Sequence, residues 1–364
     1  MNIVFRVDGS ADIGLGHIMR CITLAKQLVK QHSVSFLSCA LPRQVELLLI
    51  ASGVTLLTTK NIDTSVSAKK SCSEGTLQAF DQIEHANVCK GIVENTIQTH
   101  VDLLIVDHYQ LSAPFCHAMR TQCSHIMVID DLANRTHDCD ILLDQNYYDD
   151  FETRYNNLVP EGAYTLLGPK YALLREEFYR PLTKARCDNH FIVCFGGSDP
   201  ANMTERVVDI LLSLKANHFT ADIVVGAAYL QLSQLKEKLA NQKNMTLYHD
   251  TPFLTTLMQK ANFMVGAGGS MHWERAKLSV TGLIVTLAQN QVATTRCLHE
   301  KECCLYIGES QNVTSGEIRK AIEFALNSPE KIREIADNAH FLVGEHQAPS
   351  FVADEILKVI TRYT

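Results

Sequence analysis

The sequence lacks long apolar runs and an excess of positive charge. No stretch approaches the ~20 consecutive apolar residues that a membrane-spanning helix requires. The 33 lysines and arginines are outnumbered by 40 aspartates and glutamates, which gives a formal net charge of −7. Proteins that bind nucleic-acid backbones usually carry a positive net charge. The chain is therefore expected to bind neither a membrane nor a nucleic acid.

Disulfide spacing is also missing. Twelve cysteines are scattered through the 364 residues, and no two of them form a C-x-x-C pair. Many unpatterned thiols in a long chain are typical of a reducing compartment, whereas small secreted domains use cysteine as a disulfide framework. The apolar stretch at the amino terminus is short and already charged at Arg6, unlike a secretory signal. The sequence predicts a cytoplasmic protein.

Several common catalytic motifs are absent. There is no H-E-x-x-H zinc motif and no G-x-S-x-G nucleophile turn, and no G-K-[ST] follows a glycine-rich stretch. His137 and Cys139 have no partner at zinc-ligand spacing. The pair Asp130-Asp131 at the end of an apolar run fits either a divalent ion or, more commonly, a loop cap. We expect no required metal and no cofactor.

What the sequence does contain is two series of short apolar runs that alternate with helical patterns. Continuous apolar runs separated by helices indicate a parallel sheet covered on both faces. The first series comprises residues 3–7, 34–39, 54–57, 103–106, 126–129 and 141–143, and the second comprises 191–195, 223–225, 245–248, 263–265, 283–286 and 305–307. The expected fold is α/β, with two doubly wound domains and a ligand in the cleft between them.

Domain boundaries follow from breaks in this pattern. Residues 181–189 contain a proline and basic residues but no apolar period, which is typical of an interdomain linker. We therefore expect an amino-terminal domain at 1–180 and a carboxyl-terminal domain at 190–364 whose last part, 314–364, is helical. Residues 60–75 are rich in Ser, Lys and Thr and predict an exposed loop.

The first apolar run ends in a glycine-rich turn, DGSADIGLGH at 8–17, that opens a helix. Glycines let a ligand approach the main chain, and a helix amino terminus offers unpaired N–H groups. Asp8, Gly14 and Gly16 are therefore candidate substrate-binding residues. Met19 stands where a dinucleotide fingerprint needs a third glycine or alanine, which argues against NAD. A tight turn without a ligand is the alternative.

His17 follows this turn directly and is the candidate catalytic residue. The positive end of a helix disfavours the imidazolium form, so a histidine there tends to stay neutral and can accept a proton. Asp12 is near enough in sequence to orient the ring. The alternative is a histidine that only hydrogen-bonds loop carbonyls.

Two further apolar runs end in glycines, a serine and a helix. Such a turn is the sequence form of an anion cradle made from main-chain amides. Two of them in one domain favour phosphate binding over plain tight turns, which are the alternative. The candidate phosphate-binding residues are Gly197, Ser198, Gly268, Gly269 and Ser270.

Four polar or aromatic residues complete the candidate set. Glu274 lies one helical turn beyond the last cradle, where a carboxylate can accept hydrogen bonds from ribose hydroxyls or simply face the helix dipole. Asn290 and Gln291 carry amides that both donate and accept, as readers of sugar hydroxyl or acetamido groups do; a helix cap is the alternative. Tyr109 is a candidate sugar contact, or else a packing residue.

Taken in order, these stretches resemble the nucleotide-sugar hydrolases of pseudaminic acid biosynthesis. The matching motifs are RVDGS at 6–10, IGLGH at 13–17, VDHY at 106–109, IDDLANR at 129–135, LGPKYALLREEF at 167–178, GGSDP at 196–200, GAGGS at 266–270, WE at 273–274 and NQ at 290–291. They run in the family's order. The chain departs from the family in a longer 60–98 region and in Asn262, where an aspartate is expected.

The resemblance implies a GT-B architecture, in which two Rossmann-like domains face each other across the active site, as in UDP-sugar glycosyltransferases. It implies that His17 is the catalytic base and Asn290 a substrate-binding residue. The Gly268–Ser270 turn and Glu274 would hold the UDP. The implied reaction is hydrolysis of a UDP-linked 2,4-diacetamido-2,4,6-trideoxy sugar, and this particular sugar comes from the resemblance alone.

Two other functions fit the same residues. A GT-B glycosyltransferase would pass a UDP-linked amino sugar to an acceptor, but the first half shows no basic amphipathic helix for meeting a lipid acceptor, which favours water. A nucleotide-sugar-binding protein without chemistry is the other alternative. The expected partner is a small UDP-sugar in each case, and a monomer is favoured.

Overall fold

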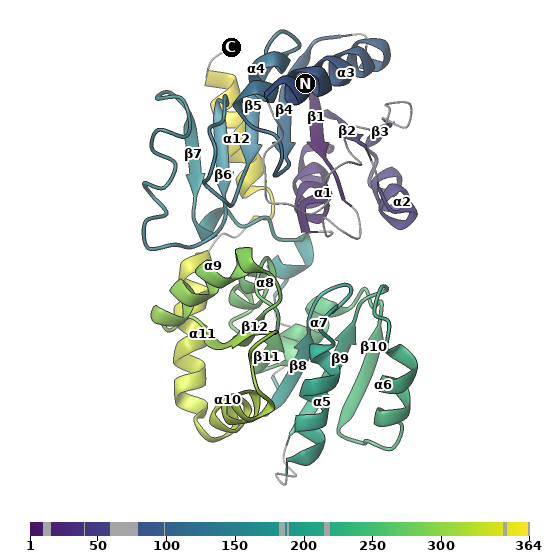
Figure 1. The fold of residues 1–364 in the computed structure, drawn as a ribbon, viewed down its shortest axis with the longest axis vertical. Helices are drawn as coiled ribbons and strands as arrows, with labels where there is room; N and C mark the ends of the chain where they lie inside the picture. The colour runs from purple at the N-terminus through teal and green to yellow at the C-terminus, as the bar shows by residue number, and fades with distance from the viewer. Residues whose placement is uncertain are drawn as a thin grey trace. The chain divides into compact units, whose positions relative to one another are not determined.

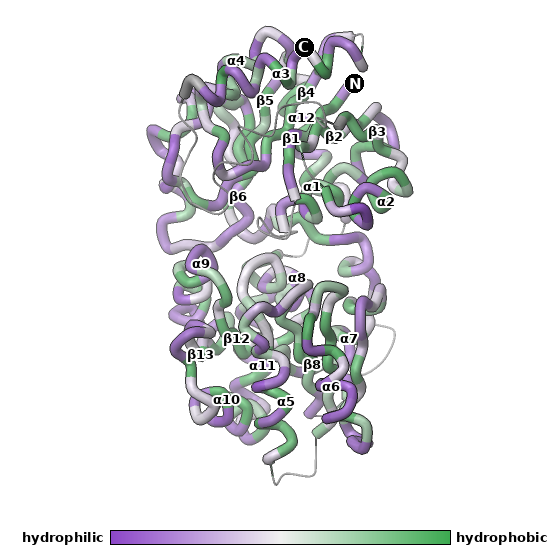
Figure 2. Tube along the Cα trace, turned by 45° about the vertical axis from the view of Figure 1, so that its right-hand side comes forward, coloured by the Kyte–Doolittle hydropathy of each residue, from purple (hydrophilic) through white to green (hydrophobic). Residues whose placement is uncertain are grey.

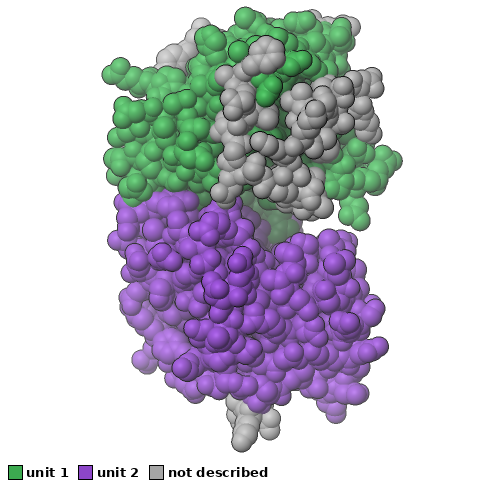
Figure 3. Space-filling view, in the orientation of Figure 1, with its two compact units in different colours: residues 1–146, 150–175, 347–364 green, residues 147–149, 176–346 purple. Residues whose placement is uncertain are grey.

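The computed structural model describes residues 1–9, 16–39, 41–58, 79–97, 99–181, 186–187, 189–214, 219–344 and 348–362. The chain divides into two compact units (Figure 3). Unit 1 comprises Met1–Asn146, Asp150–Arg175 and Gln347–Thr364, and unit 2 comprises Tyr147–Asp149 and Glu176–His346. Each unit has a parallel sheet of its own.

Unit 1 is built on a seven-stranded parallel sheet (Figure 1). Its strands are β1 (Asn2–Val7), β2 (Ser33–Ser38), β3 (Thr55–Thr58), β4 (Val101–Asp107), β5 (Cys123–Ile129), β6 (Ile141–Asp144) and β7 (Tyr164–Leu167). Their spatial order is β3-β2-β1-β4-β5-β6-β7, and all neighbouring pairs are parallel. The order reverses between β1 and β4. At such a switch point a ligand-binding crevice forms outside the carboxyl ends of the two strands.

Helices cover both faces of this sheet because its central strands are apolar on both sides. Phe5 of β1 lies in one core with residues of α1 (Gly16–Leu28), α2 (Arg43–Ala51) and α12 (Phe351–Arg362). Its neighbour Val4 lies in the opposite core with residues of α3 (Ala79–Ile97) and α4 (Ala113–Met119). A 3₁₀ turn, η1 (Pro169–Tyr171), follows β7. The layers thus hold the carboxyl ends of β1 and β4 in fixed positions.

Unit 2 repeats this plan with six parallel strands. They are β8 (His190–Cys194), β9 (Thr220–Val225), β10 (Met245–His249), β11 (Phe263–Gly266), β12 (Thr281–Thr286) and β13 (Leu305–Glu309). The order is β10-β9-β8-β11-β12-β13, so the switch point lies between β8 and β11. Figure 2 shows hydrophobic stretches in central strands such as β8 and β12. The predicted glycine-rich turns follow the two strands at the switch point.

Unit 2 contains seven α-helices among the described residues, and one of them begins at a full capping box. They are α5 (Met203–Ser213), α6 (Leu232–Leu239), α7 (Leu254–Lys260), α8 (Met271–Lys277), α9 (Gln289–Glu300), α10 (Ser315–Asn327) and α11 (Pro329–Val343), with a 3₁₀ turn, η2 (Glu176–Tyr179). Before α10, Thr314 and Glu317 form a reciprocal capping box. Of the described helices, none is long and apolar enough to cross a bilayer.

The predicted α/β fold with two doubly wound domains is confirmed. All twelve apolar runs form strands. β7 is the strand that the pattern misses, because Tyr164 and Thr165 are exposed and leave no apolar run. The predicted boundary at 180 lies near the division between Arg175 and Glu176. Residues 60–75, and parts of 181–189, lie outside the described residues.

The last helix departs from the expected domain division. The sequence analysis assigns 190–364 to one domain, whereas α12 belongs to unit 1 and contacts α1. Val352, Ile356 and Ile360 of α12 are buried in the unit 1 core. Helical periodicity shows that a helix has a buried face, but it does not show which sheet that face covers. The chain therefore returns to its first unit at its end.

Candidate active site

His17 lies in the first turn of α1 and contacts Asp107, the last residue of β4. The distance from His17 Nδ1 to Asp107 Oδ1 is 2.5 Å, and both side chains are buried. An unprotonated Nδ1 would face the lone pairs of the carboxylate, so we assign the proton to Nδ1, which donates it to Asp107. Nε2 then holds the free lone pair. The contact sets the tautomer in which Nε2 of His17 can accept a proton.

Arg20, one turn further along α1, fixes the Asp107 carboxylate. Its Nε lies 2.6 Å from Oδ2 and its Nη2 lies 2.7 Å from Oδ1, which makes a bidentate ion pair. Its Nη1 lies 3.0 Å from Asp131 Oδ2, just beyond β5. Burial alone raises the pKa of Asp107, but Arg20 and His17 outweigh it and hold that pKa well below its usual range. Asp107 is therefore a carboxylate at neutral pH.

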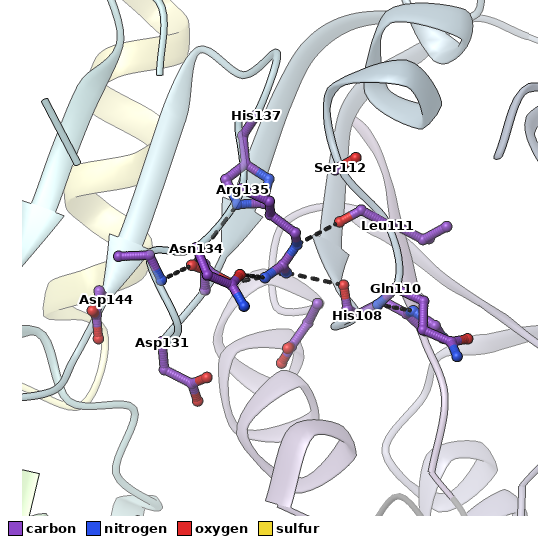
Figure 4. Close-up of polar contacts among 12 residues, drawn as sticks. His108, Gln110, Leu111, Ser112, Asp131, Asn134, Arg135, His137 and Asp144 are labelled. Atoms are coloured by element: carbon purple, nitrogen blue, oxygen red, sulfur yellow. Dashed lines mark hydrogen bonds and ion pairs between the residues drawn. The ribbon is translucent and has the colours of Figure 1, made fainter. Parts of the chain in front are cut away.

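Tyr109 contacts the ring of His17. The two ring centroids lie 4.4 Å apart with their planes at 90°. Arg135 holds the loop that carries Tyr109, because it donates to the carbonyls of Leu111 at 3.0 Å and His108 at 3.2 Å (Figure 4). The structure thus brings two sequence-predicted residues, His17 and Tyr109, together at the end of β4.

Asp8, directly after β1, is buried among protein donors. Arg6 pairs with both of its oxygens at 2.8 Å, and His108 Nε2 lies 3.1 Å from Oδ2. The amide of Cys39 donates to Oδ1 at 2.8 Å. Burial raises the pKa of Asp8, but Arg6 and His108 outweigh it and lower that pKa below its usual range. Asp8 therefore ties together the ends of β1, β2 and β4.

The same arrangement recurs at the ends of four neighbouring strands. A buried carboxylate ends or follows each of β1, β4, β5 and β6, and each has an arginine partner. The pairs are Asp8–Arg6, Asp107–Arg20, Asp130–Arg135 and Asp144–Arg154. Because the carboxyl ends of parallel strands meet at one edge, the four ion pairs form a row across the switch point. This row is polar yet balanced in charge, and His17 lies on it.

Tyr155 joins two carboxylates of this row. Its hydroxyl lies 3.0 Å from Asp130 Oδ2 and 3.0 Å from Asp144 Oδ2. A hydroxyl carries one proton, so it can donate to only one of them. Burial raises the pKa of Asp144 to about 7, although Arg154 at 2.7 Å acts in the other direction. The Tyr155 hydroxyl therefore donates to either Asp130 or Asp144, and the two carboxyl groups share this donor.

The raised pKa of Asp144 predicts a pH-dependent stability. The carboxyl titrates near 3.8 in the unfolded chain and at about 7 in the folded one, so its contribution to stability is lost as pH rises through 7. Between about pH 5 and pH 8, the free energy of unfolding of Asp144→Asn should rise by about 2 kcal/mol relative to wild type. Denaturant titrations measure this, with exposed Asp150→Asn as control. Parallel curves for Asp144→Asn and wild type would contradict the assignment.

In unit 2, the turn after β8 offers less to an anion than its sequence predicts. Gly197 and Ser198 are exposed. However, the following helix α5 is already capped, because Asp199 accepts hydrogen bonds from the amides of Met203 at 3.0 Å and Thr204 at 2.7 Å. Those two amides are not available to a phosphate. The exposed main chain of Gly197 and Ser198 is what this turn can offer.

The turn after β11 lies beside the start of α9. Gly269 has a φ of +83°, a left-handed conformation that favours glycine. A Cβ at Gly268 would lie 3.2 Å from Gln291 Cβ, and one at Gly269 would lie 3.8 Å from Gln291 Nε2. Gln291 is itself held in place, because its Oε1 accepts from the Leu287 amide at 2.9 Å. The structure thus brings three predicted residues, Gly268, Gly269 and Gln291, into contact distance.

The other predicted residues of unit 2 lie at the same edge of the sheet. Ser270 is the exposed residue before α8, and Glu274 is partly exposed in the first turn of that helix. Asn290 is exposed in the first turn of α9. These helices follow β11 and β12, which are neighbouring strands. Their grouping agrees with a shared ligand, and their roles in binding UDP stay predictions.

The structure adds three residues to the group around His17. The His17 ring is held by Asp107, which is in turn held by Arg20, and Arg20 also contacts Asp131. The sequence suggests Asp12 for this task, but Asp12 and Gly14 lie outside the described residues. A signal for Asp107 was present, since it ends a buried apolar run. Sequence distance alone favours Asp12, but parallel strands bring β4 beside β1.

The described residues contain no group of three or more His, Cys, Asp or Glu side chains placed to hold a metal ion. Asp130, considered above for a divalent ion, instead caps its loop. Its Oδ2 accepts from the Ala133 amide at 2.9 Å.

Gly16, another predicted substrate-binding residue, precedes His17 at the exposed start of α1.

Comparison with known sequences gives distant relatives across most of the chain. No family model matches it. It is 27% identical over 303 residues to UDP-2,4-diacetamido-2,4,6-trideoxy-β-L-altropyranose hydrolase of Campylobacter jejuni, a match covering 83% of this chain and 97% of that protein. It is 21% identical over 328 residues to spore coat polysaccharide biosynthesis protein SpsG of Bacillus subtilis, covering 85% of this chain and 84% of that protein.

Solved structures share the fold over nearly the whole chain. MurG of Acinetobacter baumannii matches with a TM-score of 0.65 at 14% identity, covering 99% of both chains. A UDP-glucosyltransferase of Polygonum tinctorium matches at 0.69 and 12% identity, covering 99% and 98%. UDP-GlcNAc 2-epimerase of Neisseria meningitidis matches at 0.59 and 13% identity, covering 98% and 100%. At these identities the likeness shows the fold alone, which is GT-B.

The sequence relatives and the shared fold point the same way. The ordered motifs of the sequence predict both a GT-B architecture and a particular hydrolase family. The match to the Campylobacter hydrolase, which spans nearly all of that protein, confirms that this chain resembles the nucleotide-sugar hydrolases of pseudaminic acid biosynthesis.

Proposed function

We propose that this chain is a nucleotide-sugar hydrolase that cleaves the anomeric C–O bond of UDP-2,4-diacetamido-2,4,6-trideoxy-β-L-altropyranose in pseudaminic acid biosynthesis. The products are UDP and 2,4-diacetamido-2,4,6-trideoxy-L-altrose. The observation that carries the reaction type is the His17–Asp107 pair at the switch point of unit 1. The similarity to the Campylobacter hydrolase supports the choice of sugar.

In this mechanism unit 1 supplies the base. Asp107 holds the Nδ1 proton, so Nε2 of His17 takes a proton from water while the water oxygen bonds to the anomeric carbon. The bond from that carbon to the diphosphate oxygen breaks, and its electron pair leaves with UDP. His17 afterwards releases its proton to solvent. A positioned general base contributes typically ~10²–10⁴-fold to the rate.

Unit 2 binds the UDP in this proposal. Main-chain amides face the diphosphate, a carboxylate faces the ribose and side-chain amides face the sugar. Main-chain donors held in place stabilise the charge that develops on the leaving UDP, so the proposed reaction needs no metal ion. The residues assigned to these contacts are Gly197, Ser198, Gly268, Gly269, Ser270, Glu274, Asn290 and Gln291.

An acceptor-free assay tests the proposed function. Purified protein is incubated with the UDP-sugar and EDTA, without any acceptor, and followed by proton NMR. We expect UDP and the free 2,4-diacetamido sugar to form in equal amounts at a steady rate. Loss of turnover with EDTA, restored by a divalent ion, would contradict the metal-independent mechanism alone.

The same assay separates the hydrolase from its alternatives. Glycosyltransferases are among the solved structures that share this fold, which keeps sugar transfer as the second candidate. An unchanged spectrum with UDP still binding by calorimetry would favour a transferase that lacks its acceptor, or a binding protein without chemistry.

We also propose that the protein acts in the cytoplasm. The eleven cysteines among the described residues are all free thiols, and most of them are buried. Free thiols in this number fit a reducing compartment.

A further inference from the structure

One buried arginine of unit 2 has no acidic partner among the residues that the structure describes. Of the described residues, four arginines are less than one-tenth exposed, and Arg6, Arg20 and Arg135 each pair with a carboxylate. Arg275, on α8, is 1% exposed, and no carboxylate of the described chain accepts a hydrogen bond from it. Buried charges are normally paired. Arg275 is thus a positive charge with no counter-charge in the described part of the chain.

The groups around Arg275 are neutral. Its Nη1 donates to the Val280 carbonyl at 3.3 Å, and its Nη2 donates to the Cys303 carbonyl at 3.0 Å. Burial lowers the pKa of Arg275, yet a guanidinium stays protonated at neutral pH. A Cβ at Gly282 would lie 2.5 Å from Arg275 Nε, so the glycine makes room for the charge. The site is therefore built around a buried cation.

A chain of hydrogen bonds leads from Arg275 to the start of α9. Nη2 of Arg275 also lies 3.2 Å from Nδ1 of His272, a ring that is fully buried. Burial and Arg275 hold the pKa of His272 well below its usual range, so the ring is neutral. Its Nδ1 accepts from Arg275, and its Nε2 therefore donates to Thr295 Oγ1 at 3.0 Å. Thr295 Oγ1 donates in turn to the Gln291 carbonyl at 2.7 Å.

Gly268 rests against three links of this chain. A Cβ at Gly268 would lie 3.0 Å from Thr295 Oγ1, 3.2 Å from Gln291 Cβ and 3.3 Å from His272 Nε2. These distances are shorter than ordinary van der Waals contacts, so a side chain at position 268 would require its neighbours to shift by a few tenths of an ångström. A shift of the hydrogen-bonded side chains His272 and Thr295 would therefore move the Gly268–Ser270 turn, to which the proposed function assigns the diphosphate.

We infer that Arg275, His272 and Thr295 form a positioning network for diphosphate binding, in which Arg275 supplies positive charge that a bound diphosphate balances. The inference rests on the proposed function, which places UDP on the Gly268–Ser270 turn. A diphosphate carries negative charge and uridine carries none, so the network acts on UDP and not on the nucleoside. The three residues position the turn and do not contact the reacting atoms.

Paired titrations with UDP and with uridine test the network. Thr295→Val keeps the size of the side chain but breaks the chain of hydrogen bonds, Arg275→Met removes the charge, and Arg275→Lys retains it. Arg296→Met, an exposed arginine on α9, is the matched control for lost charge. Calorimetry measures the affinity for UDP, and ligand NMR measures the affinity for uridine. Thermal melting checks that each variant is folded.

The ratio of the two affinities decides the outcome. We expect Thr295→Val and Arg275→Met to lower the affinity for UDP about tenfold and the affinity for uridine less than about twofold. In the hydrolysis assay, both variants should show a raised KM and little change in kcat. Arg275→Lys should lose less UDP affinity than Arg275→Met, and Arg296→Met should match wild type.

Equal losses for UDP and uridine, or no loss in folded Thr295→Val, would overturn the inference. A wild-type protein that binds no UDP would overturn the inference and the assigned nucleotide site together. UDP binding without hydrolysis would instead contradict the hydrolase alone, because the affinity ratio does not depend on turnover.

Discussion

Replacing His17 with asparagine is expected to lower kcat by about 10²–10⁴-fold while KM changes by less than about threefold. Nε2 of His17 is the proposed acceptor of the water proton, and an asparagine amide has no comparable basicity. The fold should persist because Asp107 keeps its bidentate pair with Arg20. UDP affinity should persist as well, since the nucleotide is assigned to unit 2. Acceptor-free kinetics and a UDP titration measure these quantities.

His117 provides the matched control for this substitution. It lies on α4 of unit 1, its side chain is 84% exposed, and it pairs with Asp138 at the surface. His117→Asn should leave kcat unchanged. If His17→Asn turned over within about threefold of wild type, the water would need another base, and the proposed role of His17 would be wrong.

Much of the fold could be predicted because each unit is a doubly wound sheet. Central strands such as β1 and β8 are buried on both faces and therefore read as continuous apolar runs. Edge strand β7 could not be found this way, since two of its four residues face solvent. The unit to which α12 belongs depends on tertiary packing, which a single helical period does not record.

The candidate site was predictable where it depends on local sequence. His17 follows a glycine-rich turn at a helix start, and Gly268 and Gly269 follow a strand end, so main-chain geometry selects these residue types. Asp107 is 90 positions from His17 in sequence, and their contact exists because β4 pairs with β1. A single sequence carries no record of that pairing.

Two further features of the site needed side-chain geometry. The glycine-rich turn before Asp199 has the sequence of an anion-binding turn. In the structure, however, the Asp199 carboxylate accepts hydrogen bonds from two amides at the start of α5. Arg275 reads as one of two basic residues in the last turn of α8, where a cation usually faces solvent. Its burial without a carboxylate is visible only in the structure. The inference about function therefore depends on the amides that Asp199 already occupies and on the Arg275 charge that no described carboxylate balances.

Replacing Asp107 with asparagine is the second change with a large expected effect. In the proposed mechanism His17 becomes positively charged as it takes the proton of water, and the Asp107 carboxylate at 2.5 Å would stabilise that charge. Asparagine removes the negative charge while Arg20 stays beside the ring, with Nη2 3.0 Å from His17 Nδ1. We expect kcat to fall on the order of 10²-fold, with KM and UDP affinity nearly unchanged.

A spectroscopic readout separates this role from a purely structural one. Nitrogen NMR of the His17 ring should show the proton on Nδ1 in wild type, and a mixture of tautomers in Asp107→Asn, because an amide can face the ring with either its oxygen or its nitrogen. A wild-type ring with its proton on Nε2 would contradict the proposed orientation.

The Asp222–His190 pair of unit 2 is the matched control. It has the same chemistry, with a 3.1 Å contact and both side chains less than one-tenth exposed. Both Asp222→Asn and Asp107→Asn should lower the melting temperature, the latter because it leaves Arg20 with fewer partners. Asp222→Asn should leave kcat unchanged. If both variants lost activity equally, general destabilisation would explain the effect. A loss confined to Asp107→Asn would show that this carboxylate acts through His17.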